Sequence, residues 1–460
     1  MTHPDTGDAP LLQDEPAVTA SRLARIGGRP ATALLAGYSI YILLGTLVLL
    51  LPLSRVLPVS PLDALFIATS AVSTTGLVTV DPGTTFSLFG EIAILLMIQV
   101  GGLGYMTIGS VALLTFQERL SAPREALTRT AFDLPGEIKL GAFLRAVVLF
   151  TLTIEALGAA ALYLMFKGAG VADPGWSALF HAVSAFCTAG FSLFPDSLER
   201  FSGHPGVLLV VSALSLFGAM GFLIVVDVWR ALHKRRARLG FTTRIIVRVT
   251  AALIAIATLL LFVADPAIAA LPFGERMLAA FFQSMTAATT VGFNSVPIGG
   301  LSAAMLMALV ILMVIGASPA GTGGGIKTTA FATLVALVRA TLRGKRGAAL
   351  WGHRLPDEKV RIAAATLAYY CTVMCVALLL LLMTESGAAF EAVLFETVSA
   401  MGTVGLSAGL TGDLTPWGKL ILIVLMTAGR LGILTFGIAI TRFRPEHLWV
   451  AERAEHLSPR

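Results

Sequence analysis

The chain has 460 residues, of which 56% are hydrophobic and 13% are charged, with a mean hydropathy of +0.85 and a formal net charge of +6. This composition excludes a soluble globular domain, and three cysteines do not make a disulfide framework. A chain this apolar indicates a membrane protein. Long apolar stretches can satisfy their backbone hydrogen bonds in a bilayer only as helices, so the sequence predicts an all-α membrane protein.

The first 30 residues are polar and rich in Pro, Asp and Arg, without the basic start, apolar core and cleavage site of a signal peptide. We expect a disordered cytoplasmic tail there. Beyond this tail, several apolar stretches approach or exceed the length that crosses a bilayer as a helix. They are residues 33–53, 88–116, 143–166, 207–228, 245–264 and 362–383.

Four short segments share a Thr-x-Gly-(Leu/Phe) core and recur roughly every 110 residues. They are SAVSTTGLVTV around Gly76, SAFCTAGFSLF around Gly190, TAATTVGFNSV around Gly292 and SAMGTVGLSAG around Gly405. Before each core lies an apolar segment of roughly 12–15 residues, which is too short to cross the membrane and suits a helix that enters and turns back. Helix-start signals stand at Ser60-Pro61-x-Asp63 and Asp173-Pro174, with weaker ones near Pro272 and Ser386.

We therefore predict four parallel repeats of span, pore helix, extended loop and span, which gives eight transmembrane helices around a pseudo-fourfold pore. Many secondary transporters use inverted repeats instead, so a carrier of an organic solute is the weaker alternative. The predicted boundaries are a tail at 1–30, repeats at 31–118, 119–236, 237–345 and 346–443, and a tail at 444–460.

The four glycine cores have the chemistry of a site for a bare cation. Glycine can adopt positive φ and bring its carbonyl close to an axis, and the carboxyl ends of the pore helices direct partial negative charge to the same place. Neutral carbonyl rings without a carboxylate ring suit a weakly hydrated monovalent ion, and we expect no transition-metal site. Tight packing could explain one such glycine, but four at matching depth favour a pore. The candidate ion-binding residues, which we call the glycine loops, are Thr74, Thr75, Gly76, Thr188, Ala189, Gly190, Thr290, Val291, Gly292, Thr403, Val404 and Gly405.

The distribution of positive charge predicts the orientation in the membrane. Most of the 33 lysine and arginine residues fall in the tails and in the loops that join the repeats. The opposite side receives only Arg55, Lys167, Arg200, Arg276 and Lys419. This asymmetry puts both termini in the cytoplasm. Because the basic clusters are juxtamembrane, we expect them to meet anionic lipid headgroups or a cytosolic partner and not nucleic acid.

The motifs STTGLV, CTAGFS, TTVGFN and GTVGLS, each followed by a second span, resemble the four filters of the Trk/Ktr/HKT superfamily of potassium transporters. The resemblance covers residues 33–443, and eight crossings are most similar to the Ktr-type membrane subunit. It implies a potassium uptake pore in the cytoplasmic membrane, usually a homodimer on a cytosolic ring of nucleotide-binding regulatory subunits. It implies no cofactor in this chain. Gly76 favours potassium, while sodium-permeable or sodium-coupled transport is the nearer alternative.

Further glycines follow the glycine loops by about 25 residues, where they should break or loosen the second span of repeats one, two and four. They form the clusters Gly101–Gly104, Gly218–Gly221 and Gly429–Gly432. In repeat three, a proline and five glycines in GASPAGTGGGIKTT cannot continue a helix. A phosphate-binding loop is excluded because Ile326 stands directly before Lys327, where that motif requires glycine.

The superfamily resemblance implies that the interrupted segment is an intramembrane gate below the filter. The residues that this role falls on are Gly316, Ala317, Ser318, Pro319, Ala320, Gly321, Thr322, Gly323, Gly324 and Gly325. Arg430 lies in an otherwise apolar span, so it should face a wet cavity or the carbonyls of this loop. The resemblance implies that Arg430 raises a barrier for cations, and a purely structural arginine is the alternative.

The remaining polar residues carry weaker predictions. For Glu155 in mid-span we prefer a bundle-facing, hydrogen-bonded carboxyl over proton coupling. Asp81 and Asp196 either raise the cation concentration at the pore mouth or are ordinary loop charges. Cys371 and Cys375 are expected to pack in a span. Since the histidines, cysteines and Glu155 form no recognisable catalytic set, the chain is not expected to be an enzyme.

Overall fold

The computed structural model describes residues 30–118, 140–233, 239–345 and 347–441. The described residues are mostly helical, with irregular loops between the helices, an isolated bridge between Arg55 and Phe86, and one hairpin of β1 (Ala349–Leu350) and β2 (His353–Arg354). The predicted C-terminal tail, and the N-terminal tail up to residue 29, lie outside the described residues.

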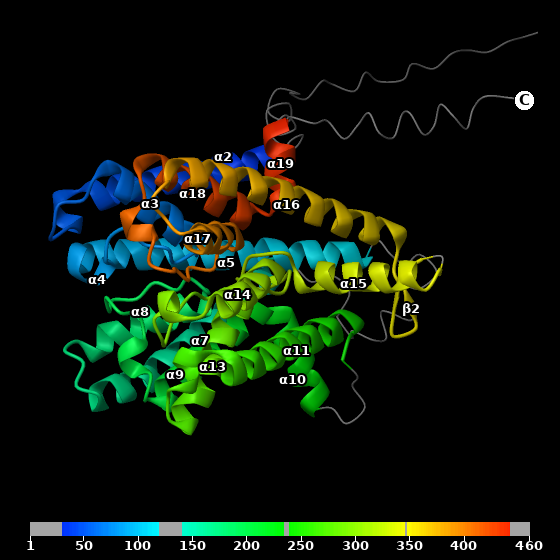
Figure 1. The fold of residues 1–460 in the computed structure, drawn as a ribbon, viewed down its shortest axis with the longest axis horizontal. Coiled ribbons are helices and arrows are strands. Elements are labelled where there is room, and N and C mark those ends of the chain that lie inside the picture. The colour runs from blue at the N-terminus through cyan, green and yellow to red at the C-terminus, as the bar shows by residue number, and fades with distance from the viewer. Residues whose placement is uncertain (1–29, 119–139, 234–238, 346, 442–460) are drawn as a thin grey trace, which may run out of the picture.

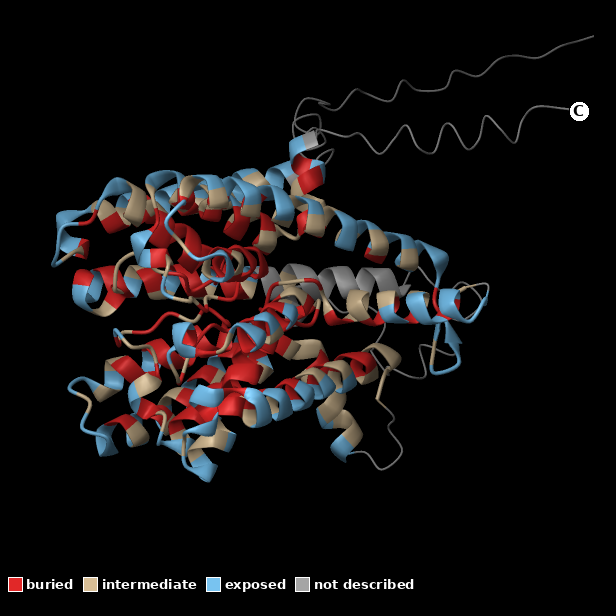
Figure 2. Cartoon of the chain, in the orientation of Figure 1, coloured by how far each residue is buried: buried red, intermediate tan, exposed pale blue. Residues whose placement is uncertain are grey.

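Five long helices run side by side along one direction (Figure 1). They are α2 (Pro30–Leu50), α5 (Leu88–Glu118), α7 (Leu140–Gly168), α11 (Phe241–Ala264) and α16 (Asp357–Thr384). Within the described residues, four stretches of these helices are long and apolar enough to cross a membrane, namely 32–50, 144–168, 241–264 and 357–384. Leucines on their outer faces, such as Leu47 and Leu164, are 62% and 69% exposed, as side chains that face lipid would be (Figure 2).

Two further spans are sharply bent. α9 (Pro205–Met220) meets α10 (Phe222–His233) at 104°, and α18 (Pro416–Leu431) meets α19 (Ile433–Thr441) at 109°. The hinges are Gly221 and Gly432, whose φ angles of +81° and +82° are rarely open to other residues. The predicted glycine breaks are confirmed in these two repeats.

The prediction for repeat one was wrong, because α5 continues unbroken through Gly101–Gly104. Gly101 and Gly102 instead allow close packing. A Cβ on Gly101 would lie within 3.0 Å of the Val72 carbonyl, and one on Gly102 within 3.0 Å of the Cys187 side chain.

In repeat three the second span is interrupted as predicted, between α14 (Ala303–Ile315) and α15 (Thr328–Leu342). Counting each bent pair as one span, the described residues hold up to six candidate spans by length and composition. The other two predicted crossings fall on α5 and on α14 with α15. These elements contribute the shorter apolar helices Leu88–Gly104, Ala303–Ile315 and Thr328–Leu342, so the total of eight stays a prediction.

Four short helices lie in the buried centre (Figure 2). They are α3 (Pro61–Val72), α8 (Pro174–Phe186), α13 (Phe273–Thr289) and α17 (Phe390–Gly402). The Ser60 side chain caps α3 by accepting from the Asp63 N–H at 3.1 Å, as predicted. α8 begins at Pro174 without a side-chain cap, and α17 begins after Ser386, at Phe390, because residues 386–388 form a turn.

Each second span packs on the short helix of the next repeat, so the contacts close into a ring. The contacting pairs are α5 with α8, α9 with α13, α14 with α17, and α18 with α3. An ion pair of 2.7 Å between Lys419 on α18 and Asp63 on α3 joins the fourth repeat to the first, and both side chains are only 15% exposed. The remaining one-turn elements are α4 (Pro82–Thr85), α12 (Pro266–Ala269), η1 (Pro52–Ser54), η2 (Glu199–Phe201), η3 (Ile298–Gly300) and η4 (Thr411–Asp413).

Candidate functional site

The four short helices end in the same hydrogen-bonded turn. At the end of α3, the Thr74 N–H bonds to the Ala71 carbonyl at 3.0 Å and the Thr75 N–H to the Ser70 carbonyl at 2.8 Å, which is a Schellman motif. Its left-handed position normally takes glycine, but here it holds a threonine in every repeat. The φ angles are +49° at Thr74, +50° at Thr188, +57° at Thr290 and +47° at Thr403.

The four glycines that follow these threonines also have positive φ, between +66° at Gly190 and +95° at Gly76 and Gly405. Each glycine abuts the backbone of another glycine loop so closely that a Cβ would lie within 3.0 Å of a carbonyl oxygen. The close approaches run from Gly76 to Ala189, from Gly190 to Val291, from Gly292 to Val404 and from Gly405 to Thr75. The four glycine loops therefore form a closed ring in chain order.

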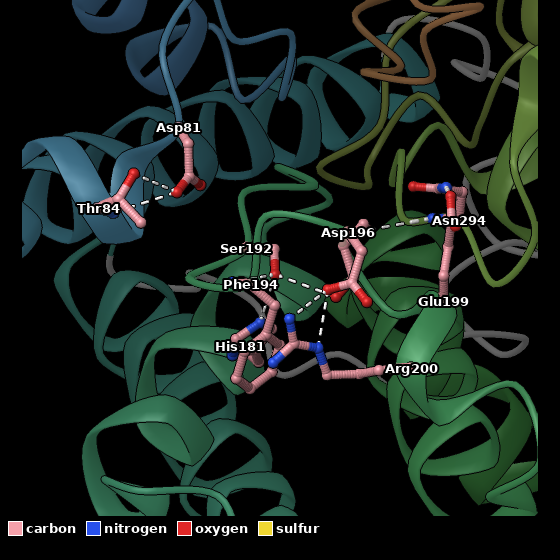
Figure 3. Close-up of polar contacts among 10 residues, drawn as sticks. Asp81, Thr84, His181, Ser192, Phe194, Asp196, Glu199, Arg200 and Asn294 are labelled. Atoms are coloured by element: carbon pink, nitrogen blue, oxygen red, sulfur yellow. Dashed lines mark hydrogen bonds and ion pairs between the residues drawn. The ribbon is translucent and has the colours of Figure 1, made fainter.

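One cavity of about 370 Å³ opens above this ring, and all four glycines line it. The predicted acids Asp81 and Asp196 line it as well (Figure 3). The Asp81 carboxylate accepts from the backbone and hydroxyl of Thr84 and so caps α4, while Asp196 pairs with Arg200 at 2.7 Å. Both acids therefore have a structural partner and also face the cavity.

Glu199 also lines the cavity, and the sequence analysis missed it. Its carboxylate accepts from Asn294 Nδ2 at 2.6 Å, which joins the outer loops of repeats two and three (Figure 3). Burial raises the pKa of Glu199 and the Asp196 charge adds to this rise, although the Asn294 hydrogen bond opposes it. Its position three residues after Asp196 is the signal that could have found it.

A hydroxyl side chain also recurs six residues before each glycine, which the sequence analysis did not use. The Ser70 and Ser399 hydroxyls accept from the N–H groups of Gly76 and Gly405 at 3.0 and 3.1 Å. In repeat two, Ser184 donates to the Phe191 carbonyl at 2.8 Å. Thr286 holds the matching position in repeat three. Aligning the four repeats on their glycines would have shown this position.

The segment from Gly316 to Lys327 lies directly against the threonines of the glycine loops. The Thr188 and Thr322 hydroxyls are 3.1 Å apart, and the Gly324 N–H donates to Thr290 Oγ1 at 2.9 Å. A Cβ on Gly324 would lie within 3.0 Å of Thr403 Oγ1. The interrupted segment thus closes the side of the ring opposite the cavity.

Arg430 is 1% exposed and lies beside this segment, as predicted. Its guanidinium donates to the Thr322 carbonyl and, at 2.8 Å, to the Gly101 carbonyl of α5. Lys327 Nζ likewise donates to the Gly323 carbonyl at 2.6 Å. Two cations therefore hold the carbonyls of the interrupted segment.

Glu155 of α7 faces the bundle and is hydrogen bonded, as we preferred. Its carboxylate accepts from Gln99 Nε2 at 3.1 Å and lies 3.8 Å from Cys187 Sγ. Within the described ranges, no three His, Cys, Asp or Glu side chains gather as metal ligands would.

Comparison with known proteins gives a family match over most of the chain. The profile of the TrkH family, described as cation transport protein, matches residues 39–448. The solved structure of the potassium transporter TrkH from Vibrio parahaemolyticus is similar in fold, with a TM-score of 0.71 at 20% identity over 89% of this chain and 84% of that chain.

Three curated relatives match nearly end to end. The chain is 37% identical to Ktr system potassium uptake protein B of Vibrio alginolyticus, over 91% of this chain and 92% of that protein. It is 36% identical to Ktr system potassium uptake protein B of Bacillus subtilis, over 88% and 92%. It is 35% identical to potassium/sodium uptake protein NtpJ of Enterococcus hirae, over 91% and 94%. The chain therefore belongs to the TrkH family of cation transport proteins, a family of membrane transporters and not of enzymes.

Proposed function

We propose that the protein is the pore-forming subunit of a potassium uptake system in the cytoplasmic membrane. The observation that carries this proposal is the closed ring of glycine loops, in which each glycine leaves just enough room for the carbonyl of another loop. The two Ktr relatives are named as potassium uptake proteins, which supports the choice of ion.

In this proposal the glycine loops are the selectivity filter. The residues are Thr74, Thr75, Gly76, Thr188, Ala189, Gly190, Thr290, Val291, Gly292, Thr403, Val404 and Gly405. Their carbonyls replace the hydration shell of the ion, and the C-termini of α3, α8, α13 and α17 add negative potential. The Thr74 and Thr403 hydroxyls are buried without a hydrogen-bond partner among the described residues, which leaves their oxygens free to face an ion.

The segment from Gly316 to Gly325 is the proposed gate. Its position against Thr188, Thr290 and Thr403 would stop an ion that leaves the filter toward the cytoplasm. The buried guanidinium of Arg430 adds an electrostatic barrier at the same place. Opening must therefore move the segment away from these threonines.

The architecture that goes with this function has eight crossings in four pseudo-fourfold repeats, with both termini in the cytoplasm. We also propose that the chain works as a homodimer with cytosolic nucleotide-binding subunits. Both relatives are named as parts of a Ktr system, which supports the participation of further components.

Sodium permeation is a second candidate, because the Enterococcus hirae relative is named as an uptake protein for both potassium and sodium. Flux into liposomes that contain the purified protein separates the two candidates. Potassium uptake that exceeds sodium uptake by roughly tenfold or more supports a potassium filter. Equal fluxes would favour the sodium-permeable candidate, and no cation flux at all would overturn the proposal.

A further inference from the structure

Three of the four short helices carry a buried polar side chain at the same place, nine residues before the glycine. They are His181 on α8, Gln283 on α13 and Glu396 on α17, and each is at most 1% exposed. A polar group in a membrane core destabilises the protein unless it is hydrogen bonded, so the recurrence of this position requires an explanation.

Each of these side chains bonds to the segment that leaves its own glycine loop. His181 Nε2 lies 2.9 Å from Ser192 Oγ, and Gln283 Oε1 accepts from the Ser295 N–H at 3.2 Å. The Glu396 carboxylate accepts from the Ser407 hydroxyl and, at 2.7 Å, from the Thr411 hydroxyl. We call His181, Gln283 and Glu396 the braces.

In repeat one, the brace position and its partner position both hold apolar side chains. Ile67 stands at the brace position and is fully buried, and Val78 stands where repeats two and four have Ser192 and Ser407. Polar residues in repeats two and four therefore face polar partners, and an apolar residue in repeat one goes with an apolar one. This matching indicates that the helix and the outer segment act as a pair.

The brace of repeat two has a defined hydrogen-bond direction. His181 Nδ1 lies 2.7 Å from the Ser177 carbonyl, which can only accept, so Nδ1 carries a proton and Nε2 accepts from Ser192. The Phe194 N–H in turn donates to Ser192 Oγ at 2.9 Å, and the Phe194 ring stacks on His181 at 4.7 Å (Figure 3). The outer segment is held by its backbone as well as its side chains.

The brace of repeat four holds a longer stretch. Both Glu396 oxygens are engaged, and the Ser407 hydroxyl that contacts one of them also accepts from the Gly409 N–H at 2.9 Å. Ser407, Gly409 and Thr411 all line the cavity above the ring, whereas Glu396 itself does not. The carboxylate therefore fixes the cavity wall from behind.

We propose that the three braces are positioning residues that set ion selectivity by holding the outer ends of the glycine loops in place. A ring of carbonyls that cannot contract discriminates against the smaller sodium ion, and relaxed supports allow the ring to shrink. None of the braces lines the cavity, so an effect on selectivity must act through the loops. This inference rests on the proposed potassium function.

The test replaces the polar side chains of the brace in repeat four by apolar ones, like those that repeat one has. The triple variant Glu396→Leu, Ser407→Ala, Thr411→Val removes the buried carboxylate together with the two hydroxyls that donate to it, so neither hydroxyl is left without its acceptor. The backbone N–H groups of Ala408, Gly409 and Leu410 lose an acceptor in this variant, and the unfolding measurement below reports that cost. We expect the sodium-to-potassium flux ratio in liposomes to rise about fivefold. Glu396→Gln, which keeps a hydrogen-bonding side chain, should recover at least half of this change, and Ile67→Leu in repeat one should change nothing.

Thermal unfolding of each purified variant shows whether it is folded, and Gln283→Leu provides a second site at which the ratio must rise. If the triple variant and Gln283→Leu both fold and both keep the wild-type flux ratio, the proposed role of the braces is wrong, while the proposed potassium function is unaffected. If the wild-type protein itself does not prefer potassium over sodium, both the proposed function and the proposed role of the braces are wrong.

Discussion

At the scale of single residues, the ring depends on two residues per repeat whose backbone has the left-handed conformation, and these two residues have different roles. Thr74 and its three counterparts accept a conformation that normally belongs to glycine, which places a hydroxyl at the ring. The glycine two positions later needs the same conformation and also the space of a missing Cβ. A substitution at the threonine can keep the backbone, but one at the glycine cannot.

Gly76→Ser should therefore weaken discrimination against sodium. The new Cβ would meet the Ala189 carbonyl and occupy a strained φ of +95°. A cost of about 1–3 kcal/mol would shift the loop, so we expect a loss of potassium preference of about fivefold or more in liposome flux. Gly37→Ser is the matched control, because a Cβ there meets open space. Unchanged selectivity in Gly76→Ser would contradict the position given to Gly76.

Glu199 predicts a dependence on external pH. Its ionised carboxylate attracts cations to the cavity, and its raised pKa means that protonation begins at a higher pH than for a glutamate of ordinary pKa 4.5. Potassium flux at low salt should fall roughly twofold as the outer pH drops through this pKa, and the flux of Glu199→Gln should stay at the low-pH level of the wild type at every pH.

The same raised pKa has an effect on stability with a defined sign. The raised pKa means that the folded state favours the protonated carboxyl of Glu199 more than the unfolded state does. The contribution of this group to the free energy of unfolding is therefore fully present below the pKa of the unfolded state, and it is lost as pH rises through the pKa of the folded state. Glu199→Gln should thus unfold no more easily than wild type at neutral pH. Glu358→Gln, on the exposed start of α16, should show neither effect, and a pH profile unchanged by Glu199→Gln would refute the role of this acid.

At the scale of elements, the break between α14 and α15 is the gate that we propose. Its backbone bonds to α9 through the Thr322 N–H and Gly218 carbonyl at 3.0 Å, and to the Thr290 hydroxyl through the Gly324 N–H. The Thr322 hydroxyl contacts the Thr188 hydroxyl. Arg430 joins it to α18 and α5. The segment is thus held by hydrogen bonds to the surrounding elements and lacks a helical ladder of its own.

Deleting residues 320–323 should raise potassium flux severalfold, because the shortened segment can no longer reach the threonines of the ring. A milder variant, Thr322→Val, keeps the volume but removes the contacts to Thr188 and to the Phe186 carbonyl, and it should raise flux by about twofold. Flux is measured in liposomes at equal amounts of incorporated protein. Fluxes equal to wild type in both variants would count against a gate here.

At the scale of the whole molecule, the four repeats close into a ring through contacts that join neighbours in chain order. The Lys419–Asp63 pair completes this order by linking the fourth repeat to the first, some 356 residues away in the sequence. A single chain therefore reaches an arrangement that other proteins obtain from several subunits.

The sequence was sufficient to predict the glycine loops, the breaks within Gly218–Gly221 and Gly429–Gly432 and the interruption from Gly316 onward, because glycine and proline act locally on the backbone. It did not predict that α5 stays straight through Gly101–Gly104, since the same residue type serves both hinges and close packing. His181, Gln283 and Glu396 differ in type at one position, so their common role emerged only from their contacts.

In the proposed filter, the glycine loops surround a bare alkali ion. The anomalous diffraction of crystals grown in rubidium, a heavier ion of similar size to potassium, would locate that ion. We predict anomalous peaks on the axis of the ring, coordinated by carbonyls from all four loops. Crystals whose rubidium lies only at other places, with no peak between Gly76, Gly190, Gly292 and Gly405, would show that the glycine loops are not an ion filter.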